Sequence, residues 1–201
     1  METKQAESEL SFIKKVMEDS RQVAMDNGKY YIFWGVLVSI TIIMNYVMII
    51  LNVRGGNYYW LVWIVMMFGG GIATTIMKFR DVKKAKVHTF TGRILSSVWL
   101  AGGIAMFMIA FVGPAFKAYS YVYINPIISL VLGIMYFVSG GLQQIRWLKY
   151  LSLGWWSGAI VLFAFPGIHS MLVFGLMLVF LQTIPGIMLY KKWKKEINPA
   201  A

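Results

Sequence analysis

Long apolar stretches alternate with short polar or basic segments along this 201-residue chain. Six stretches hold about 20 apolar residues each, the length that a helix needs to cross roughly 30 Å of hydrocarbon. Strands of that length are not expected, because lipid leaves the edges of an open sheet without hydrogen-bond partners. The pattern predicts an all-α fold, a bundle of six transmembrane helices within residues 29–195. The predicted spans are 30–51, 58–77, 94–116, 121–142, 147–165 and 171–190.

Residues 1–28 show a different pattern, that of a cytoplasmic amphipathic helix. Leu10, Ile13 and Met17 recur at helical spacing on one stripe, and charged residues fill the other faces. Gly28 would end this helix, because glycine accepts the left-handed conformation that follows many helices. Two interpretations stay open: the helix lies on the bilayer or on the protein's own loops, or it docks a cytoplasmic partner. Residues 196–201 are expected to form a short tail.

The composition agrees with a membrane protein. Hydrophobic residues make up 59% of the chain and charged residues 13%, whereas soluble domains have about 45–50% and about 25%. The chain has no cysteine and two histidines, His88 and His169, which excludes thiol chemistry, disulfides and cysteine–metal sites.

The basic residues predict the orientation of the bundle. All but two of the 19 Lys and Arg residues fall on alternate connections, the exceptions being Arg54 and Lys117. The side of a membrane that is rich in Lys and Arg is cytoplasmic, so both termini are expected inside, in a multi-pass protein of the cytoplasmic (inner) membrane. The net charge of +11 therefore indicates attraction to anionic headgroups at the cytoplasmic face, and no nucleic-acid partner is expected.

Residues for catalysis are scarce. Between Gly28 and Glu196 the sequence has one carboxylate, Asp81, which does not supply a proton-transfer path, a Mg²⁺ site or a zinc-ligand set. A Ser–His pair from His169 with Ser139 or Ser157 is disfavoured by the predicted depths of these residues. We expect no catalytic residue, no metal site, no cofactor and a non-enzymatic role.

Neutral polar residues inside the spans are the candidate ligand-binding residues. Asn45, Gln182 and Thr183 fall within the expected hydrocarbon, and Pro185 should kink the last span and free nearby carbonyls. They form either ordinary hydrogen bonds between helices or a small polar cavity near the midplane. Pairs of small residues four positions apart, such as Gly35 and Ser39, are expected to pack helices closely.

Two resemblances add to this picture. Residues 27–35, NGKYYIFWG after a charged helix, resemble the opening of small uncharacterised bacterial six-helix integral membrane proteins, a resemblance that brings no functional residues. The size and helix count are similar to those of the substrate-binding subunits of energy-coupling-factor vitamin transporters. Those subunits pack on their partner through Ala-x-x-x-Ala in the first span, where this chain has Gly35 and Ser39.

Two functional hypotheses follow. The first is a non-enzymatic membrane subunit that scaffolds or regulates a protein partner, or a second copy of itself, at the cytoplasmic face. The second is a transporter or substrate-capture subunit for a small neutral or amphiphilic molecule. The partner-binding candidates lie on the N-terminal helix and in the connection 78–93: Leu10, Ile13, Met17, Lys83, Lys84 and Lys86.

Overall fold

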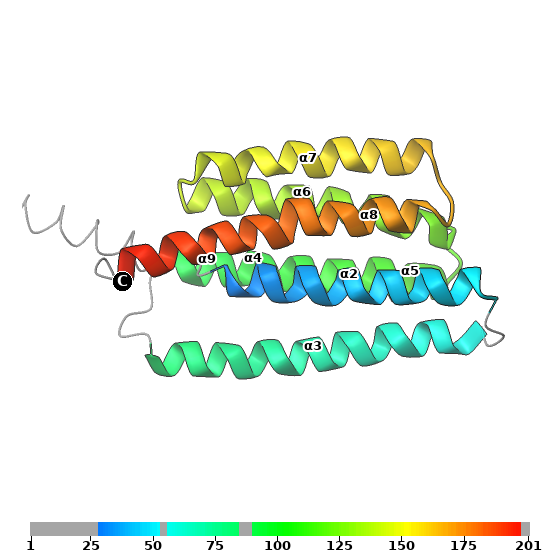
Figure 1. Ribbon diagram of the computed structural model, residues 1–201, viewed down its shortest axis with the longest axis horizontal. Helices are drawn as coiled ribbons and strands as arrows, with labels where there is room; N and C mark the ends of the chain where they lie inside the picture. Colours follow the sequence, from blue (N-terminus) through cyan, green and yellow to red (C-terminus); the bar gives the residue numbers. More distant parts are fainter. Residues whose placement is uncertain (1–27, 53–55, 85–89, 198–201) are drawn as a thin grey trace, which may run out of the picture.

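The computed structural model describes residues 28–52, 56–84 and 90–197, and every regular element in these ranges is helical. The helices run side by side in one elongated bundle (Figure 1). The longer helices are α2 (Lys29–Ile50), α3 (Gly56–Lys84), α4 (Phe90–Phe107), α6 (Ile124–Leu142), α7 (Arg146–Ala164), α8 (Ser170–Leu178) and α9 (Ile184–Ile197). The short elements are η1 (Met108–Val112), α5 (Gly113–Ala115), η2 (Tyr121–Tyr123) and η3 (Val179–Thr183).

All six predicted spans are helical, which confirms the all-α fold. Five helical segments are long and apolar enough to cross a membrane. The sixth, α7, is as long as its neighbour α6, with 19 residues each, but Arg146, Lys149 and three tryptophans make it less apolar. The predicted connection 78–93 is wrong in part, because α3 continues to Lys84 and α4 begins at Phe90.

Two of the spans contain a π-helical segment that ends two residues before a proline. Proline has no N–H group, and its ring clashes with the carbonyl four residues earlier in an α-helix. Here the preceding residue donates to the carbonyl five residues back, Gly113 to Met108 before Pro114 and Ile184 to Val179 before Pro185. The wider turn accommodates each proline, so the two rods continue without a break. The π turn of η3 lies where the kink at Pro185 was predicted, and the chain stays helical through it.

A side-chain hydroxyl supports the carbonyl that Pro114 leaves without a backbone donor. The Tyr119 phenol, in the turn after α5, donates to the carbonyl of Ile109 over 2.5 Å, and Ile109 lies five residues before this proline. Burial raises the pKa of the Tyr119 phenol above its usual 10.0.

Close packing at glycines determines which helices pair. The most extensive contact joins α6 to α7, where Gly140 leaves no room for a Cβ atom against the backbone of Lys149. The α8–η3–α9 rod packs antiparallel on α2, with Gly35 against Thr183 and the Ser39 hydroxyl 3.5 Å from the Gly175 carbonyl. Helix α4 packs on α6. These pairs form the compact part of the bundle.

Helix α3 lies at the outside of the bundle, on the far side from α7 (Figure 1). Its main contact is with α2, where the Trp34 indole donates to the Thr74 hydroxyl over 3.0 Å and Gly70 faces the same ring. Gly69 and Gly71 have no neighbouring atom within 4 Å of an added Cβ. These two glycines therefore make no close packing contact within the described part of the chain.

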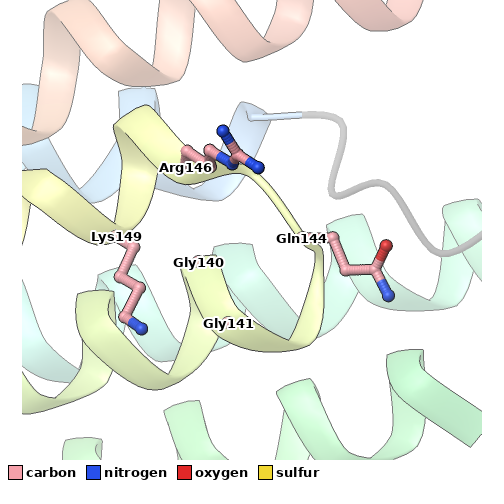
Figure 2. A pocket seen from close by; sticks show the side chains of 5 residues that line it. All are labelled: Gly140, Gly141, Gln144, Arg146 and Lys149. Carbon is pink, nitrogen blue, oxygen red and sulfur yellow. The ribbon is translucent and has the colours of Figure 1, made fainter.

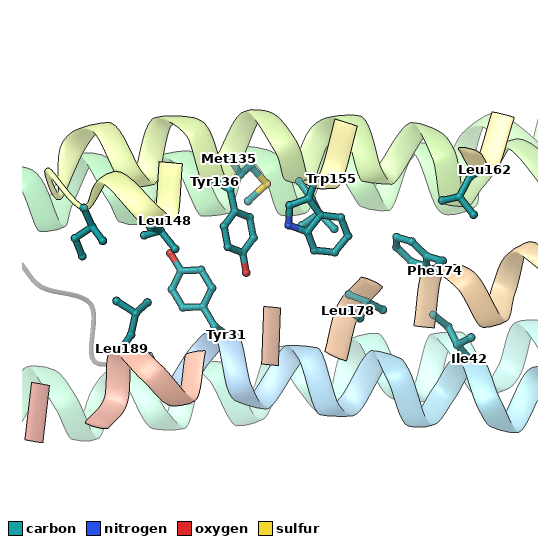
Figure 3. Close-up of a cluster of buried hydrophobic side chains, with 12 residues drawn as sticks. Tyr31, Ile42, Met135, Tyr136, Leu148, Trp155, Leu162, Phe174, Leu178 and Leu189 are labelled. Atoms are coloured by element: carbon teal, nitrogen blue, oxygen red, sulfur yellow. The ribbon is translucent and has the colours of Figure 1, made fainter. Parts of the chain in front are cut away.

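Aromatic rings fill the centre of the bundle (Figure 3). Tyr31 of α2 meets Trp99 of α4 edge-on at 5.0 Å between ring centroids, and Trp99 lies 5.9 Å from Tyr136 of α6. Tyr136 lies 5.9 Å from Trp155 of α7, and Trp155 meets Phe174 of α8 at 6.2 Å. One continuous line of rings thus connects five helices.

Burial is inverted relative to a water-soluble bundle. Large apolar side chains point outward, with Phe68 and Ile160 each 68% exposed. Small polar side chains point inward, with Ser129 and Ser139 fully buried and Asn45 2% exposed. A monomer that exposed so much contiguous apolar surface to water would aggregate. The distribution fits a bundle whose outer surface contacts hydrocarbon.

Candidate functional site

The predicted polar site divides into separate parts. Gln182 and Thr183 are buried in η3, 4% and 8% exposed, and Pro185 follows in α9. The Thr183 hydroxyl contacts Gly35 and lies 3.3 Å from the Leu178 carbonyl, to which it donates. It therefore supports the π turn, and this contact belongs to the packing of α2 on the C-terminal rod.

Asn45 does not join the other predicted residues. Its side-chain amide donates to the Thr41 carbonyl of the same helix over 3.0 Å. Ten residues separate Asn45 from Gly35, which lies beside Thr183, so it is about 15 Å farther along the axis of α2. The expectation that Asn45 and Gln182 share a midplane cavity does not fit this register.

Two polar atoms in the bundle core have no hydrogen-bond partner among the described residues. They are the Trp155 indole N–H and the Gln182 side-chain carbonyl oxygen Oε1. Trp155 is fully buried and Gln182 nearly so. Leaving such a group unpaired costs about 1–3 kcal/mol. The described residues therefore leave one donor and one acceptor in the core without a partner.

The helix register brings these two atoms to a similar depth. Gly154 of α7 packs on Leu181, and Gly158 packs on Met177, so α7 and the α8–η3 rod run antiparallel. Trp155 and Gln182 are the immediate neighbours of Gly154 and Leu181. Trp155 was not among the candidate residues selected from the sequence. Its position in the middle of a predicted span could have indicated a special role, because membrane tryptophans usually lie at the interfaces.

The next indole along the line of rings, one ring away from Trp155, has its hydrogen bond satisfied. The Trp99 indole donates to the Ser139 hydroxyl over 3.1 Å, and the Trp99 ring contacts both Tyr31 and Tyr136. Aromatic walls with a few polar groups are typical of small-molecule sites. The same ring contacts and hydrogen bond also join α2, α4 and α6, so they stabilise the helix bundle as well.

The histidine and serine residues considered for catalysis are engaged elsewhere. His169 Nδ1 lies 3.1 Å from the Tyr46 hydroxyl at one end of the bundle. The Ser157 hydroxyl donates to the Gly154 carbonyl of its own helix. No group of three or more metal-ligating side chains lies together in the described ranges.

Most partner-binding candidates lie outside the described residues, namely Leu10, Ile13, Met17 and Lys86. Lys83 and Lys84 are the last residues of α3. They lie at the end of the bundle that carries nearly all described cations, which we name the basic end. The basic end comprises the described Lys and Arg residues at 29, 78–84, 93, 146–149 and 191–195, and Lys117 lies at the opposite end.

Comparison with family models, with curated proteins and with solved structures finds no match for this chain. The two resemblances drawn from the sequence therefore stay predictions, and function has to be argued from the geometry above.

Proposed function

We propose that this chain is a six-span integral membrane protein whose basic end faces the cytoplasm, and that it serves there as a non-enzymatic docking subunit for a protein partner. The observation that carries the proposal is the extension of two helices at this one end. Helix α3 has 29 residues and is about 43 Å long, roughly a dozen ångströms more than the hydrocarbon thickness. Helix α9 also continues past its predicted span, to Ile197.

Cationic residues occupy the extensions, which we name the basic helix ends. They are Lys83 and Lys84 on α3, and Lys191, Lys192, Lys194 and Lys195 on α9. Both ends reach past the α6–α7 turn on the same side of the bundle (Figure 1). Cations in the last turn of a helix are favoured by its dipole, and a cluster of them suits an acidic protein surface. The partner is expected to present Asp and Glu residues.

Site-specific photo-cross-linking in cells tests this role. A cross-linking residue at Lys84 or Lys191 is expected to give a discrete protein adduct, and one at Phe116, 82% exposed at the opposite end, is expected to give none. Charge reversal by Lys191→Glu with Lys192→Glu should weaken the adduct formed at Lys84. Adducts of equal intensity at Phe116, or lipid adducts alone at both basic positions, would contradict the proposal.

The unpartnered core atoms favour a second candidate function, capture of a small neutral molecule. A ligand with one acceptor and one donor, such as an amide or an alcohol, would satisfy Trp155 Nε1–H and Gln182 Oε1. Each group would then recover the cost of its unpaired state, about 1–3 kcal/mol. An aromatic environment would hold the apolar part of such a molecule.

Thermal unfolding with a panel of small amides and alcohols tests capture. A ligand present at a hundred times its Kd stabilises the folded state by about 2.7 kcal/mol. We expect Gln182→Leu to abolish this stabilisation. Thr75→Val, which alters an exposed hydroxyl bonded within α3, should retain it. Equal stabilisation of both variants, or none of the unsubstituted chain, would rule out capture at this site.

A further inference from the structure

The turn between α6 and α7 combines a strained residue with a cavity. Residues 143–145 close α6 through two backbone bonds, from Ile145 N–H to the Gly140 carbonyl at 2.9 Å and from Gln144 N–H to the Gly141 carbonyl at 3.2 Å. This is the Schellman arrangement, in which glycine usually takes the left-handed position. In this turn Gln144 occupies the left-handed position, with a φ of 54°. Strain of this kind concentrates at functional sites, and here it keeps a polar side chain beside a cavity.

The cavity has a volume of about 330 Å³ and is lined by Gly140, Gly141, Gln144, Arg146 and Lys149. Figure 2 shows the Lys149, Arg146 and Gln144 side chains on different sides of the two glycines of α6, with the Gln144 amide pointing away from the glycines. Ligand pockets begin at about 300 Å³. Gly140 is packed against Lys149, but the exposed Gly141 leaves the backbone of α6 uncovered, so a ligand has access there to main-chain and side-chain groups together.

The two cations at this cavity have no carboxylate of the described bundle beside them. Between residues 28 and 195 the sequence has a single acidic residue, Asp81, and it belongs to α3, on the far side of the bundle from α7 (Figure 1). The Lys149 amine lies 4.4 Å above the Phe137 ring, which orients it without neutralising it. The local field therefore favours an anion, and the positive end of α7 adds to it.

The position of the turn indicates the source of the anion. The ends of α3 and α9 extend farther than this turn (Figure 1), so in the proposed orientation the turn lies nearer to the headgroups of the inner leaflet. Tyr150, 65% exposed, lies one residue after Lys149, as aromatic residues do at membrane interfaces. A phospholipid approaching from the side of α6 and α7 would bring its phosphate to this depth.

We infer that the α6–α7 turn is a binding site for an anionic phospholipid, with Arg146 and Lys149 holding the headgroup phosphate and the Gln144 amide contacting the polar groups of the headgroup. The inference rests on the membrane orientation proposed above. It assigns a specific site, in addition to the general attraction of a basic surface for acidic lipid.

Native mass spectrometry of the full chain in detergent tests the site with dioleoyl phosphatidylglycerol. The variant Arg146→Gln with Lys149→Gln is expected to bind this lipid roughly tenfold more weakly or worse, since each juxtamembrane cation contributes to the attraction. The matched control, Lys78→Gln with Arg80→Gln, removes two exposed charges at the same end of the bundle and should retain binding. Equal losses in the two variants, or no loss in the first, would overturn the site.

Two further measurements identify the ligand and test the role of the Gln144 side chain in the turn. Phosphatidylcholine and inorganic phosphate should not displace phosphatidylglycerol. Displacement by phosphate would make this a free-phosphate site and overturn the lipid assignment.

The variant Gln144→Gly relieves the left-handed strain at this residue, so it should raise thermal stability and weaken phosphatidylglycerol binding. Unchanged binding would overturn the role of the Gln144 side chain. Because binding is measured in detergent, a wrong membrane orientation would leave these results intact and would be detected separately by cysteine labelling.

Discussion

At the scale of single residues, contacts at glycines determine how closely the helices approach. Neighbouring glycines in α6 have opposite surroundings: Gly140 faces the backbone of Lys149, and an added Cβ at Gly141 would have no atom within 4 Å. Gly35 on α2 and both Gly154 and Gly158 on α7 pack within the bundle, whereas Gly69 on α3 faces open space. The same sequence pattern therefore serves packing at some positions and makes no contact at another.

Gly140→Ala is expected to lower the free energy of unfolding by about 1–3 kcal/mol, because overpacking forces backbones apart. Thermal unfolding in detergent measures the change. The matched variant Gly141→Ala should leave stability unchanged or slightly raised, since alanine favours helix. A larger loss from Gly141→Ala than from Gly140→Ala would show that α6 and α7 do not pack as described.

At the scale of elements, α3 is held less firmly than the other helices. Its main contact is with α2, and the bond from Trp34 to Thr74 is a specific link between them. The α6–α7 hairpin, by contrast, is packed along its whole length. Local opening follows the number of buried contacts, so α3 should separate before the other helices do.

Trp34→Phe and Thr74→Val are each expected to increase amide hydrogen exchange in α3, because both remove its link to α2. Exchange in α6 and α7 should not change. Thr75→Val serves as the control, since that hydroxyl bonds only within α3 in the described structure. Faster exchange throughout the bundle in the Trp34→Phe variant would contradict a separable α3.

At the scale of the whole molecule, the decisive feature is the separation of charge between the two ends. The described connection around Lys117 is short, and the basic end carries the helix extensions. Charges at the membrane surface determine orientation during insertion. The docking function and the lipid site both rest on the basic end lying in the cytoplasm, whereas capture of a small molecule in the core does not.

Single-cysteine labelling checks the orientation directly, because the chain has no cysteine of its own. Gln144→Cys and Lys191→Cys should react with a membrane-impermeant maleimide only after the cells are permeabilised. Lys117→Cys and Phe165→Cys should react in intact cells. Labelling of Gln144→Cys from outside would reverse the orientation and remove the basis of cytoplasmic docking.

Part of the site could be predicted and part could not. Gln182 and Thr183 were identifiable as polar residues within an apolar span, and both are buried. Their supposed neighbour Asn45 lies farther along α2, and Trp155 was not anticipated. Which residues meet depends on the antiparallel register of two helices, and side-chain polarity does not encode that register.

The sequence alone determined that the chain folds as a set of long apolar helices, because apolar length is a local property that a run of some 20 residues displays by itself. It also determined the unequal distribution of cations. Only the tertiary structure decided the helix partners, the π turns before Pro114 and Pro185, and the meeting of α6 and α7 at Gly140. The physical reason is that apolar residues cover the outward faces of all these helices and lipid is as apolar as they are, so close fit between backbones, and not hydrophobicity, selects the contacts.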